Sequence, residues 1–560
     1  MGLISKLNNF RDCYESSRIY DIYYNQDIDE GIAYLESRNG NDFTGNIFRI
    51  AEELSNDEFG DLKIYVYANE EIKSKIADFK KNYNLKIHKV ITDENEACEI
   101  LQKAKYIFTD SGIRPKFVKR EGQTMINTWH GTPLKLMGFD YPDEQPNIGI
   151  IQKSLLYSDY LLYPNEYMME IMLKAYMIDS IYPGEILLNG YPRNSIFSDE
   201  DKRAEFRKRL DFDDKEVYVY MPTFKGFVSN REDEKQKDDV DKFLEKIDVH
   251  LKGNQIFLVK FHPYNQSKID FSKFNNVFPF PEGYENYDVL NAADCLITDY
   301  SSVFFDFANS RRKIIIFNYD EEDYLKSRGI YFPLDELPFP KAGNVDELID
   351  QLNLDKDYDD EEFLNKFCGF DSINSASTIC RTVINDEKLC DHRKIENTND
   401  NILVYAAGID DNDSTKSLIE YLESIDKTQN NVFVSFKRWH QNIKENHVRV
   451  LEKIPEDVEF LPLSYPIDPT IEEKLNLNKF LKDPDNQQLY ESLKPLFERS
   501  FKKQYGNIRF DLIIDYDTND LVESLIFANS GHKNRMYFSD KSNKDIYSKF
   551  DEAYEIGEIK

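Results

Sequence analysis

The stretch CLITDYSSVFFDFANSRRKIIIF, residues 295–317, predicts a strand, a loop, a helix and a second strand in that order. Residues 295–298 form a short apolar run, and residues 313–317 are rich in β-branched side chains, as buried strands are. Residues 303–309 carry apolar side chains at helical spacing. Two strands joined through a helix form one step of a parallel sheet, so the sequence predicts an α/β fold.

The loop of this step places polar side chains where parallel sheets bind ligands. Asp299, Ser301 and Ser302 follow directly after the first strand. At the carboxyl end of a strand, the unbonded N–H groups and the dipole of the next helix attract anions. The serine pair therefore predicts a phosphate-binding turn, and an ordinary helix cap that holds no ligand is the alternative.

Length and composition limit the class of protein. With 560 residues the chain is too long for one hydrophobic core, so two or three domains are expected. It has 103 Asp and Glu against 71 Lys and Arg, and the formal charge of -32 argues against a nucleic-acid surface. Six cysteines without CxxC spacing predict reduced thiols, a cytoplasmic location and no metal framework. No apolar stretch approaches the roughly 20 residues of a membrane span, which predicts a soluble or peripheral protein.

A histidine stands at another predicted strand end. In INTWHGTPLKLMGFD, residues 126–140, a strand runs into His130, and Pro133 is placed to begin a helix. An imidazole with an ordinary pKa can accept a proton from a substrate hydroxyl near neutral pH. His130 is therefore a candidate general base, and a histidine that only satisfies backbone groups of the loop is the alternative.

Further polar residues follow predicted strands in the second half of the chain. NGYPRNSIF (189–197) is the predicted crossover between two α/β domains and carries Arg193. PTFKG (222–226) and FHPY (261–264) each follow a strand. We expect one rim of a second parallel sheet to collect cations and hydrogen-bond donors suited to a diphosphate. The residues expected at this rim are Thr223, Lys225, His262, Asp299, Ser301 and Ser302.

A series of short motifs, taken together, resembles that of a known family. The pieces, in chain order, are LESRNGNDFTGN, NTWHGTPLK, NGYPRN, MPTFKG, VKFHP, ITDYSSVFFDFA and RGIYF. They resemble the motifs of the CDP-glycerol glycerophosphotransferase family, whose members prime or polymerise teichoic-acid and related capsule backbones. Walker, GxSxG and HExxH motifs are absent from the sequence, which removes the usual NTPase, α/β-hydrolase and zinc-protease interpretations.

The resemblance implies a GT-B architecture, with Rossmann-like domains at residues 1–185 (acceptor side) and 186–384 (donor side) facing each other across a cleft. It implies transfer of a polyol phosphate from CDP-glycerol or CDP-ribitol to a hydroxyl of a lipid-linked or polyol-phosphate acceptor, with release of CMP. It also implies that no cofactor or metal ion is required. A cytoplasmic enzyme that contacts the inner face of the cell membrane is expected.

The family's motifs also imply roles for single residues. His130 corresponds to the catalytic base of the first domain, and His262 to a catalytic histidine on the donor side. The residues implied to bind the CDP-polyol are Arg193, Thr223, Lys225, His262, Asp299, Ser301 and Ser302.

The end of the chain predicts a third α/β domain. Residues 385–400 are polar and without motifs, and are expected to be a linker. Residues 402–405 and 432–436 predict strands, and FDLIIDYD (510–517) predicts the last one. Residues 401–560 therefore resemble the first Rossmann half of a glycosyltransferase, and we expect a separable accessory domain.

Two other functions fit the same sequence. A nucleotide-sugar glycosyltransferase would use the same fold, because fold alone does not determine donor chemistry. A non-catalytic scaffold of a polymer-synthesis complex would retain the fold without activity, although His130 and His262 argue against it. Release of CMP by the purified protein would distinguish these possibilities.

Overall fold

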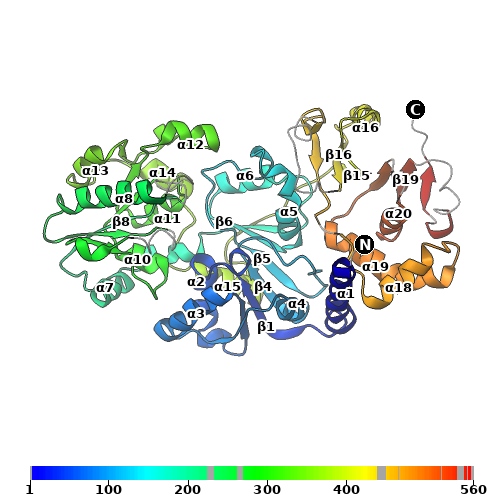
Figure 1. Ribbon diagram of the computed structural model, residues 1–560, viewed down its shortest axis with the longest axis horizontal. Coiled ribbons are helices and arrows are strands. Elements are labelled where there is room, and N and C mark those ends of the chain that lie inside the picture. The colour runs from blue at the N-terminus through cyan, green and yellow to red at the C-terminus, as the bar shows by residue number, and fades with distance from the viewer. Residues whose placement is uncertain are drawn as a thin grey trace.

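The computed structural model describes residues 3–223, 233–261, 269–437, 450–464, 466–516, 518, 520–538, 548–551 and 553–556. Each of its three sheets is covered by helices and forms the centre of an α/β domain. In Figure 1 the domain of the second sheet lies at the left, that of the first sheet in the middle and that of the third sheet at the right. The first domain therefore contacts both of the others.

The first sheet has eight strands, all parallel to their neighbours except the edge strand β14. In spatial order they are β14 (Asp391–Arg393), β7 (Glu185–Leu188), β6 (Tyr160–Tyr163), β5 (Thr124–Asn127), β4 (Ala104–Thr109), β1 (Asp29–Glu36), β2 (Lys63–Tyr67) and β3 (Ile87–Ile91). The principal helices of this domain are α2 (Gly45–Leu54), α3 (Glu70–Tyr83), α4 (Glu94–Lys103), α5 (Ile148–Tyr157), α6 (Glu166–Ala175) and α15 (Ser375–Asn385).

The second and third sheets have six parallel strands each. The second contains β10 (Val277–Pro279), β9 (Gln255–Val259), β8 (Glu216–Tyr220), β11 (Cys295–Thr298), β12 (Lys313–Phe317) and β13 (Lys341–Ala342). The third contains β17 (Val458–Phe460), β16 (Asn430–Phe436), β15 (Asp400–Ala406), β18 (Leu512–Tyr516), β19 (Arg535–Phe538) and β20 (Tyr554–Ile556).

Helices flank these sheets too, and α1 (Leu3–Ser17) precedes the first strand. The second domain has α7 (Glu200–Arg209), α8 (Asp233–Asp248), α10 (Asn286–Ala292), α11 (Val303–Phe307), α12 (Glu321–Ser327), α13 (Val345–Leu352) and α14 (Glu361–Phe367). The third domain has α16 (Asp413–Ser424), α18 (Ile471–Phe480), α19 (Gln487–Tyr505) and α20 (Leu521–Ala528).

All three sheets share one strand order. Counted along the chain within each sheet, the strands lie in the order 3-2-1-4-5-6, and the first sheet adds β7 and β14 at one edge. This is the doubly wound order, in which a crevice opens at the carboxyl ends of the first and fourth strands. The three crevices lie between β1 and β4, between β8 and β11, and between β15 and β18.

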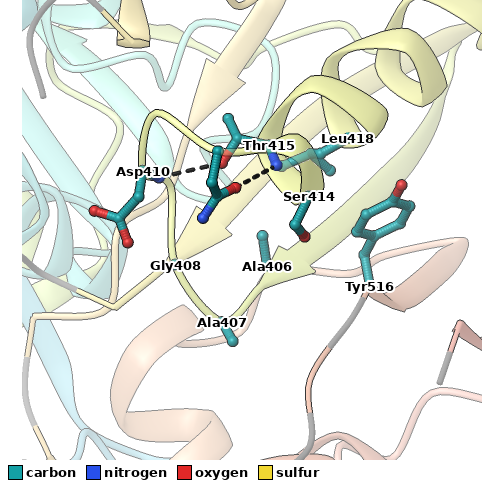
Figure 2. Close-up of a pocket in the computed structure, with 9 residues that line it drawn as sticks. Ala406, Ala407, Gly408, Asp410, Ser414, Thr415, Leu418 and Tyr516 are labelled. Carbon is teal, nitrogen blue, oxygen red and sulfur yellow. Dashed lines mark hydrogen bonds between the residues drawn. The ribbon is translucent and has the colours of Figure 1, made fainter. Parts of the chain in front are cut away.

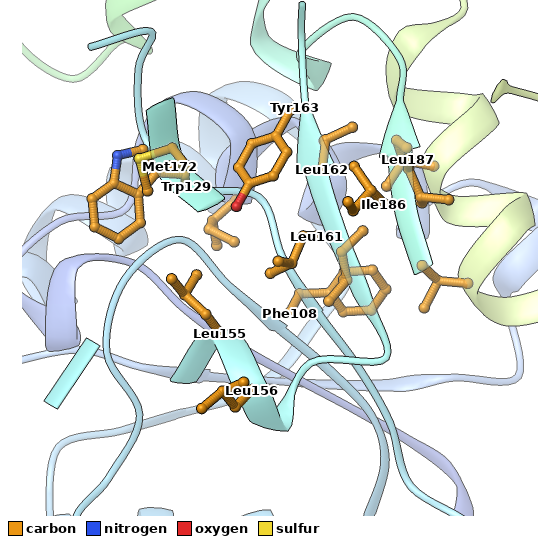
Figure 3. Close-up of a cluster of buried hydrophobic side chains, with 14 of the residues drawn as sticks. Phe108, Trp129, Leu155, Leu156, Leu161, Leu162, Tyr163, Met172, Ile186 and Leu187 are labelled. Carbon is orange, nitrogen blue, oxygen red and sulfur yellow. The ribbon is translucent and has the colours of Figure 1, made fainter. Parts of the chain in front are cut away.

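Burial explains why the strands of these sheets consist mostly of apolar residues. Helices cover both faces of a parallel sheet, so every side chain of β9 (QIFLV) and β12 (KIIIF) is buried. In Figure 3, Leu161 of β6 and Ile186 of β7 lie in the core of the first domain, and Trp129 lies at one edge of the same cluster. The loop that carries His130 is thus anchored in the core.

The structure differs from the expected domain boundaries at two places. The boundary expected after residue 185 falls inside β7, which pairs with β6 in the first sheet. The linker expected at residues 385–400 contains β14, which pairs with β7. Before it, α15 packs on α2 and buries Ile379 and Val383 in the first core. The chain therefore returns to the first domain, because the apolar face of α15 is covered there.

The third domain packs closely on the first. One buried hydrophobic cluster contains Leu156 of α5 together with Tyr505 and Phe510 of the third domain. Hydrogen bonds cross the same boundary, since Gln152 Nε2 donates to the Phe460 carbonyl at 2.7 Å. This shared core argues against a separable domain.

The third sheet also continues beyond the strand predicted to be its last. β19 and β20 follow β18 in the chain; β19 pairs with β18, and β20 pairs with β19. Their described parts are only four and three residues long, RMYF and YEI, which is too short for a periodic pattern to show in the sequence. The third domain therefore contains one full doubly wound sheet.

Removal of residues 401–560 should destabilise the rest of the chain. The truncated protein would expose the apolar side chains of α5 that now contact α19, and each 100 Å² of exposed apolar surface costs about 2.5 kcal/mol. We expect a lower thermal midpoint than that of the full chain and increased binding of a hydrophobic dye. An unchanged midpoint without dye binding would contradict this expectation.

Candidate active site

His130 lies in a strained loop that leaves the carboxyl end of β5. Trp129 has a φ of 50°, in the left-handed region that residues other than glycine seldom adopt. Its N–H donates to Asn127 Oδ1 at 2.9 Å, and its ring stacks on the His130 imidazole with 4.5 Å between the centroids. Such strain persists only where surrounding contacts hold it, and it is concentrated at functional sites. These contacts hold the imidazole in one orientation.

One ring nitrogen of His130 already has a partner. Nδ1 lies 2.7 Å from the carbonyl oxygen of Asp110. A carbonyl only accepts hydrogen bonds, so Nδ1 carries the proton and the neutral ring keeps its lone pair on Nε2. The side chain is partly exposed. One nitrogen is fixed and the other can accept a proton, as a general base requires.

The surroundings keep His130 neutral. Burial, together with the guanidinium groups of Arg38 and Arg193, lowers the pKa of the imidazole to about 3. The sequence predicts an ordinary histidine pKa, and the structure corrects this because burial and both arginines act through the tertiary fold. At neutral pH the ring is therefore in its proton-accepting form.

Hydrogen bonds to Asp110 form a latch across the crevice between β1 and β4. Ser37 Oγ and the Arg38 N–H donate to the two carboxylate oxygens of Asp110 at 2.7 and 2.8 Å. Burial raises the pKa of Asp110 to about 6, and these hydrogen bonds oppose the rise. The Asp110 side chain thus binds the loop that follows β1, and its backbone carbonyl accepts a hydrogen bond from the His130 ring.

The second sheet has a corresponding latch between β8 and β11. The backbone N–H and the hydroxyl of Thr223 donate to the Asp299 carboxylate at 2.8 and 3.0 Å. Burial raises the pKa of Asp299 to about 6, and only 1% of the residue is exposed. Thr223 and Asp299, both predicted to bind the donor, are therefore brought together at the rim. Asp299 acts there by positioning Thr223.

Ser301 and Ser302 lie at the same rim, and both are partly exposed. The Ser302 hydroxyl makes no capping hydrogen bond to α11, so the alternative of an ordinary cap does not describe it. It lies instead against the neighbouring domain, because a Cβ built on Gly131 would be 2.7 Å from Ser302 Oγ. Because residue 131 is a glycine, the loop that carries His130 can approach Ser302 of the second domain this closely.

Arg193 joins the domains beside His130. Its Nη1 donates to the His130 carbonyl at 3.0 Å, and its Nε and Nη2 donate to Asp306 of α11 at 3.2 and 2.7 Å. Its backbone N–H donates to Asn46 Oδ1 at 3.3 Å. The guanidinium, predicted to bind donor phosphates, is engaged here with protein groups. In this structure Arg193 positions the His130 loop against the second domain.

Two of the residues expected to bind the donor cannot be placed in the site. Lys225 and His262 lie outside the described residues, so their placement stays a prediction.

Pro133 begins no helix, because the chain after it is extended and Lys135 forms an antiparallel bridge with Ile330. A partner distant in the sequence overrides the local helix pattern there.

Sequence reasoning missed two charged groups near the rim. Lys260 follows β9, its Nζ donates to Asn286 Oδ1 at 2.7 Å, and burial lowers its pKa to about 8. Arg49 of α2 bonds across the domain boundary to Asp288 and, at 3.5 Å, to Glu285. Lys260 could have been found from its place after a strand, within VKFHP. Arg49 could not, because a lone arginine on an amphipathic helix is ordinarily exposed.

Comparison with known proteins assigns these residues to a family. The family model described as CDP-Glycerol:Poly(glycerophosphate) glycerophosphotransferase matches residues 18–385. This range holds both latches and the His130 loop, and it is more than half of the 560 residues. The chain belongs to this family.

Curated relatives in the family are teichoic acid enzymes. A teichoic acid poly(glycerol phosphate) polymerase of Bacillus subtilis is 29% identical over 310 residues, which are 51% of this chain and 40% of that protein. A teichoic acid glycerol-phosphate transferase of Staphylococcus aureus is 31% identical over 282 residues, 46% of this chain and 71% of that protein. The match to the polymerase thus spans less than half of its length.

A solved structure of the wall teichoic acid polymerase TagF shares the fold. It aligns with a TM-score of 0.55 and 25% identity, covering 68% of this chain and 98% of that one. The predicted GT-B-like α/β architecture is confirmed.

The His130 imidazole should stay neutral as the pH falls through the usual histidine range. Its lowered pKa, about 3, leaves Nε2 unprotonated between pH 8 and roughly pH 5. Histidine-labelled protein would show this by NMR, with the His130 resonances assigned by their loss in His130→Ala. A midpoint near the ordinary value of about 6.5 would contradict the burial argument.

Proposed function

We propose that this chain transfers glycerol phosphate, or a related polyol phosphate, from a CDP-polyol to a hydroxyl of a lipid-linked or polymer acceptor and releases CMP. One observation carries the proposal. His130, with Nδ1 held by Asp110, stands where Gly131 meets Ser302 of the other domain. The loop that carries the base of the first domain thus lies against a hydroxyl group of the second domain. The family and its teichoic acid relatives support the substrate class.

The proton path begins at Nε2 of His130. As the acceptor oxygen attacks the polyol-bearing phosphorus, Nε2 takes its proton. A new O–P bond forms, the bond from that phosphorus to the CMP oxygen breaks, and CMP leaves with the electron pair. The proton then passes from His130 to solvent. The diphosphate of a bound donor adds negative charge beside the imidazole, which raises its pKa and makes it a stronger base during the reaction.

The second domain supplies groups for the departing CMP. Ser301 and Ser302 present hydroxyls at the rim, and the Thr223 latch holds the neighbouring loop. By correspondence with the family's motifs, Lys225 and His262 add donors there. Preorganised donors at the place where charge develops lower the barrier without reorganisation during the step. The proposal assigns no metal or cofactor to this site.

Release of CMP by the purified protein tests the activity. We expect CDP-glycerol or CDP-ribitol, with a polyol-phosphate acceptor, to yield CMP, and EDTA to leave the rate unchanged. Turnover of a UDP-sugar without CMP release would indicate a glycosyltransferase, and no turnover of any donor would indicate a scaffold. Loss of activity in EDTA would overturn the metal-free proposal alone.

Lys225→Ala and His262→Ala should each weaken use of the donor. A lost hydrogen bond between charged groups is worth about 1.5–3 kcal/mol, which corresponds to roughly 10–100-fold in kcat/KM for the CDP-polyol. Lys252→Ala, at an exposed position of the same domain, is the control. Unchanged kcat and KM in both variants would remove these residues from the donor site.

A lipid-linked acceptor requires contact with a membrane surface, and we assign this to α1 and α18. Phe10 and Tyr14 of α1 and Leu475 of α18 are 63%, 51% and 56% exposed. The two helices are adjacent, since the Ile471 N–H donates to Ser17 Oγ at 2.8 Å. Among the described residues no helix is long and apolar enough to cross a bilayer. Retained co-sedimentation with lipid vesicles in the double variant Phe10→Ser, Tyr14→Ser would contradict this contact.

A further inference from the structure

The loop that follows β1 presents an exposed arginine at the crevice between β1 and β4. Arg38 and Asn39 have φ angles of 45° and 55°, in the left-handed region that residues other than glycine seldom adopt. The Arg38 N–H donates to Asp110 Oδ1 at 2.8 Å, and the Asn39 N–H donates to Ser111 Oγ at 3.2 Å. These bonds hold the loop in a conformation that leaves the side chain of Arg38 exposed.

Asp110 connects this loop with the base. Its carboxylate accepts from the Arg38 N–H, and its backbone carbonyl lies 2.7 Å from Nδ1 of His130. After burial, the charge of the Arg38 guanidinium has the largest effect among the causes that lower the pKa of His130. Arg38 therefore lies on the first-domain side of the site, close to the position that a hydroxyl must take to reach Nε2.

The guanidinium of Arg38 is not engaged within the protein as that of Arg193 is. Arg193 Nη2 donates to the buried carboxylate of Asp306 at 2.7 Å. The Arg38 side chain is 53% exposed, and within the described part of the chain its one ion-pair partner is Asp42, at 3.9 Å from Nε. An exposed ion pair of this length contributes little. The Arg38 guanidinium can therefore bind an anion.

The Asp42 carboxylate has other partners in its own turn. Its two oxygens accept from the Phe43 N–H at 2.8 Å and from the Thr44 hydroxyl at 2.9 Å. These hydrogen bonds satisfy the carboxylate without a charge from Arg38. An anion that approaches the guanidinium thus displaces only a weak contact.

The corresponding loop of the third sheet shows that the fold does not require this arginine. After β15 the chain continues with Ala407 and Gly408, which Figure 2 shows beside the first turn of α16. None of the described residues that line the crevice there is basic. Small residues therefore complete a doubly wound sheet at this position, and a strained, exposed arginine needs another explanation.

The proposed reaction indicates which anion Arg38 meets. A guanidinium presents paired N–H groups that match the oxygens of a phosphate. An acceptor that ends in a polyol phosphate carries such a group one polyol unit away from its reacting hydroxyl. The donor is assigned to the second domain, whereas Arg38 belongs to the first and lies beside the base. A phosphate that neutralises the guanidinium would also raise the pKa of His130 and make it a stronger base.

We propose that Arg38 binds the phosphate of the acceptor and so selects acceptors that end in a polyol phosphate over uncharged polyols. This inference rests on the proposed function. Arg38 holds the terminal unit so that its hydroxyl lies at Nε2 of His130. The same contact strengthens the base only while an acceptor is bound.

Arg38→Gln removes the charge and tests the choice of acceptor. We expect the KM for a glycerol phosphate oligomer to rise roughly 10–100-fold, the range for a lost hydrogen bond between charged groups, with the KM for the CDP-polyol unchanged. The preference in kcat/KM for the oligomer over free glycerol should fall by the same factor. Arg38→Lys keeps the charge without the planar fork and should recover part of the loss. Arg381→Gln breaks an ion pair with Glu58 in the same domain and should resemble the wild type.

NMR of the His130 ring gives a second test that needs no turnover. Glycerol 3-phosphate should shift the His130 resonances of the wild type saturably, and glycerol should not. Arg38→Gln should abolish this response. The variant should also raise the pKa of His130, because it removes a neighbouring positive charge. The thermal midpoint confirms that each variant is folded.

Two results would overturn the proposal. One is a wild-type acceptor KM in Arg38→Gln, and the other is an undiminished response of its His130 resonances to glycerol 3-phosphate. A raised donor KM with an unchanged acceptor KM would instead place Arg38 at the diphosphate of the donor and would also overturn it. If the wild type releases CMP from no donor, the proposed function fails, and the NMR titration still decides whether Arg38 binds a polyol phosphate.

Discussion

His130→Ala should lower kcat for CMP release at least about a hundredfold. A polyol hydroxyl is a poor nucleophile at neutral pH, and a positioned base contributes about 10²–10⁴-fold by removing its proton as the new bond forms. Nδ1 of His130 is held by Asp110 and Trp129 stacks on the ring, so the base is already oriented. Initial rates at saturating CDP-polyol measure the loss, and calorimetry should show little change in donor affinity.

Two further variants distinguish the role of His130 as a base from a purely structural role. His130→Asn can still donate to the Asp110 carbonyl through Nδ2 but offers no basic nitrogen, so it should be as slow as the alanine variant. His250→Ala, at an exposed position after α8, should retain the wild-type rate. Near-normal kcat in His130→Asn would leave His130 a structural role only. Lost donor binding in His130→Ala would make it a phosphate ligand.

Arg49→Met should destabilise the protein by about 3–5 kcal/mol, because it removes one partner of a buried charge cluster. Arg49 is 3% exposed and bonds to Glu52 at 2.7 Å, to Glu285 at 3.5 Å and to Asp288. Glu285 and Asp288 belong to the second domain, and both are buried. Without the guanidinium they would face each other uncompensated where the domains meet. Urea denaturation followed by fluorescence measures the free energy of unfolding.

A double variant tests whether the cost comes from the uncompensated charge. Arg49→Met with Asp288→Leu should regain part of the lost stability, because replacing both partners of a buried pair costs less than removing one. Lys73→Met breaks an exposed ion pair with Glu70 and should cost far less than Arg49→Met, because solvent screens exposed pairs. A loss in Arg49→Met no larger than in Lys73→Met would show that the cluster does not hold the domains together.

Much of the fold could be predicted from local patterns. Residues 295–298 and 313–317 are strands at the expected positions, because strands buried on both faces are made mostly of apolar residues. Polar side chains directly after such strands predict a ligand-binding crevice at the carboxyl edge of the sheet. That rule found His130, Thr223 and Ser302.

What the sequence determined by itself is which segments form strands and helices and which side chains stand at strand ends, because these depend on periodicity over a few residues. The tertiary structure determined the protonation state and the hydrogen-bond partners of those side chains. It lowered the pKa of His130 through burial and two arginines, and it paired Arg193 with Asp306. It also joined the third domain to the first through one core. These outcomes depend on contacts between residues far apart in the chain, and neither pattern nor composition records such distances.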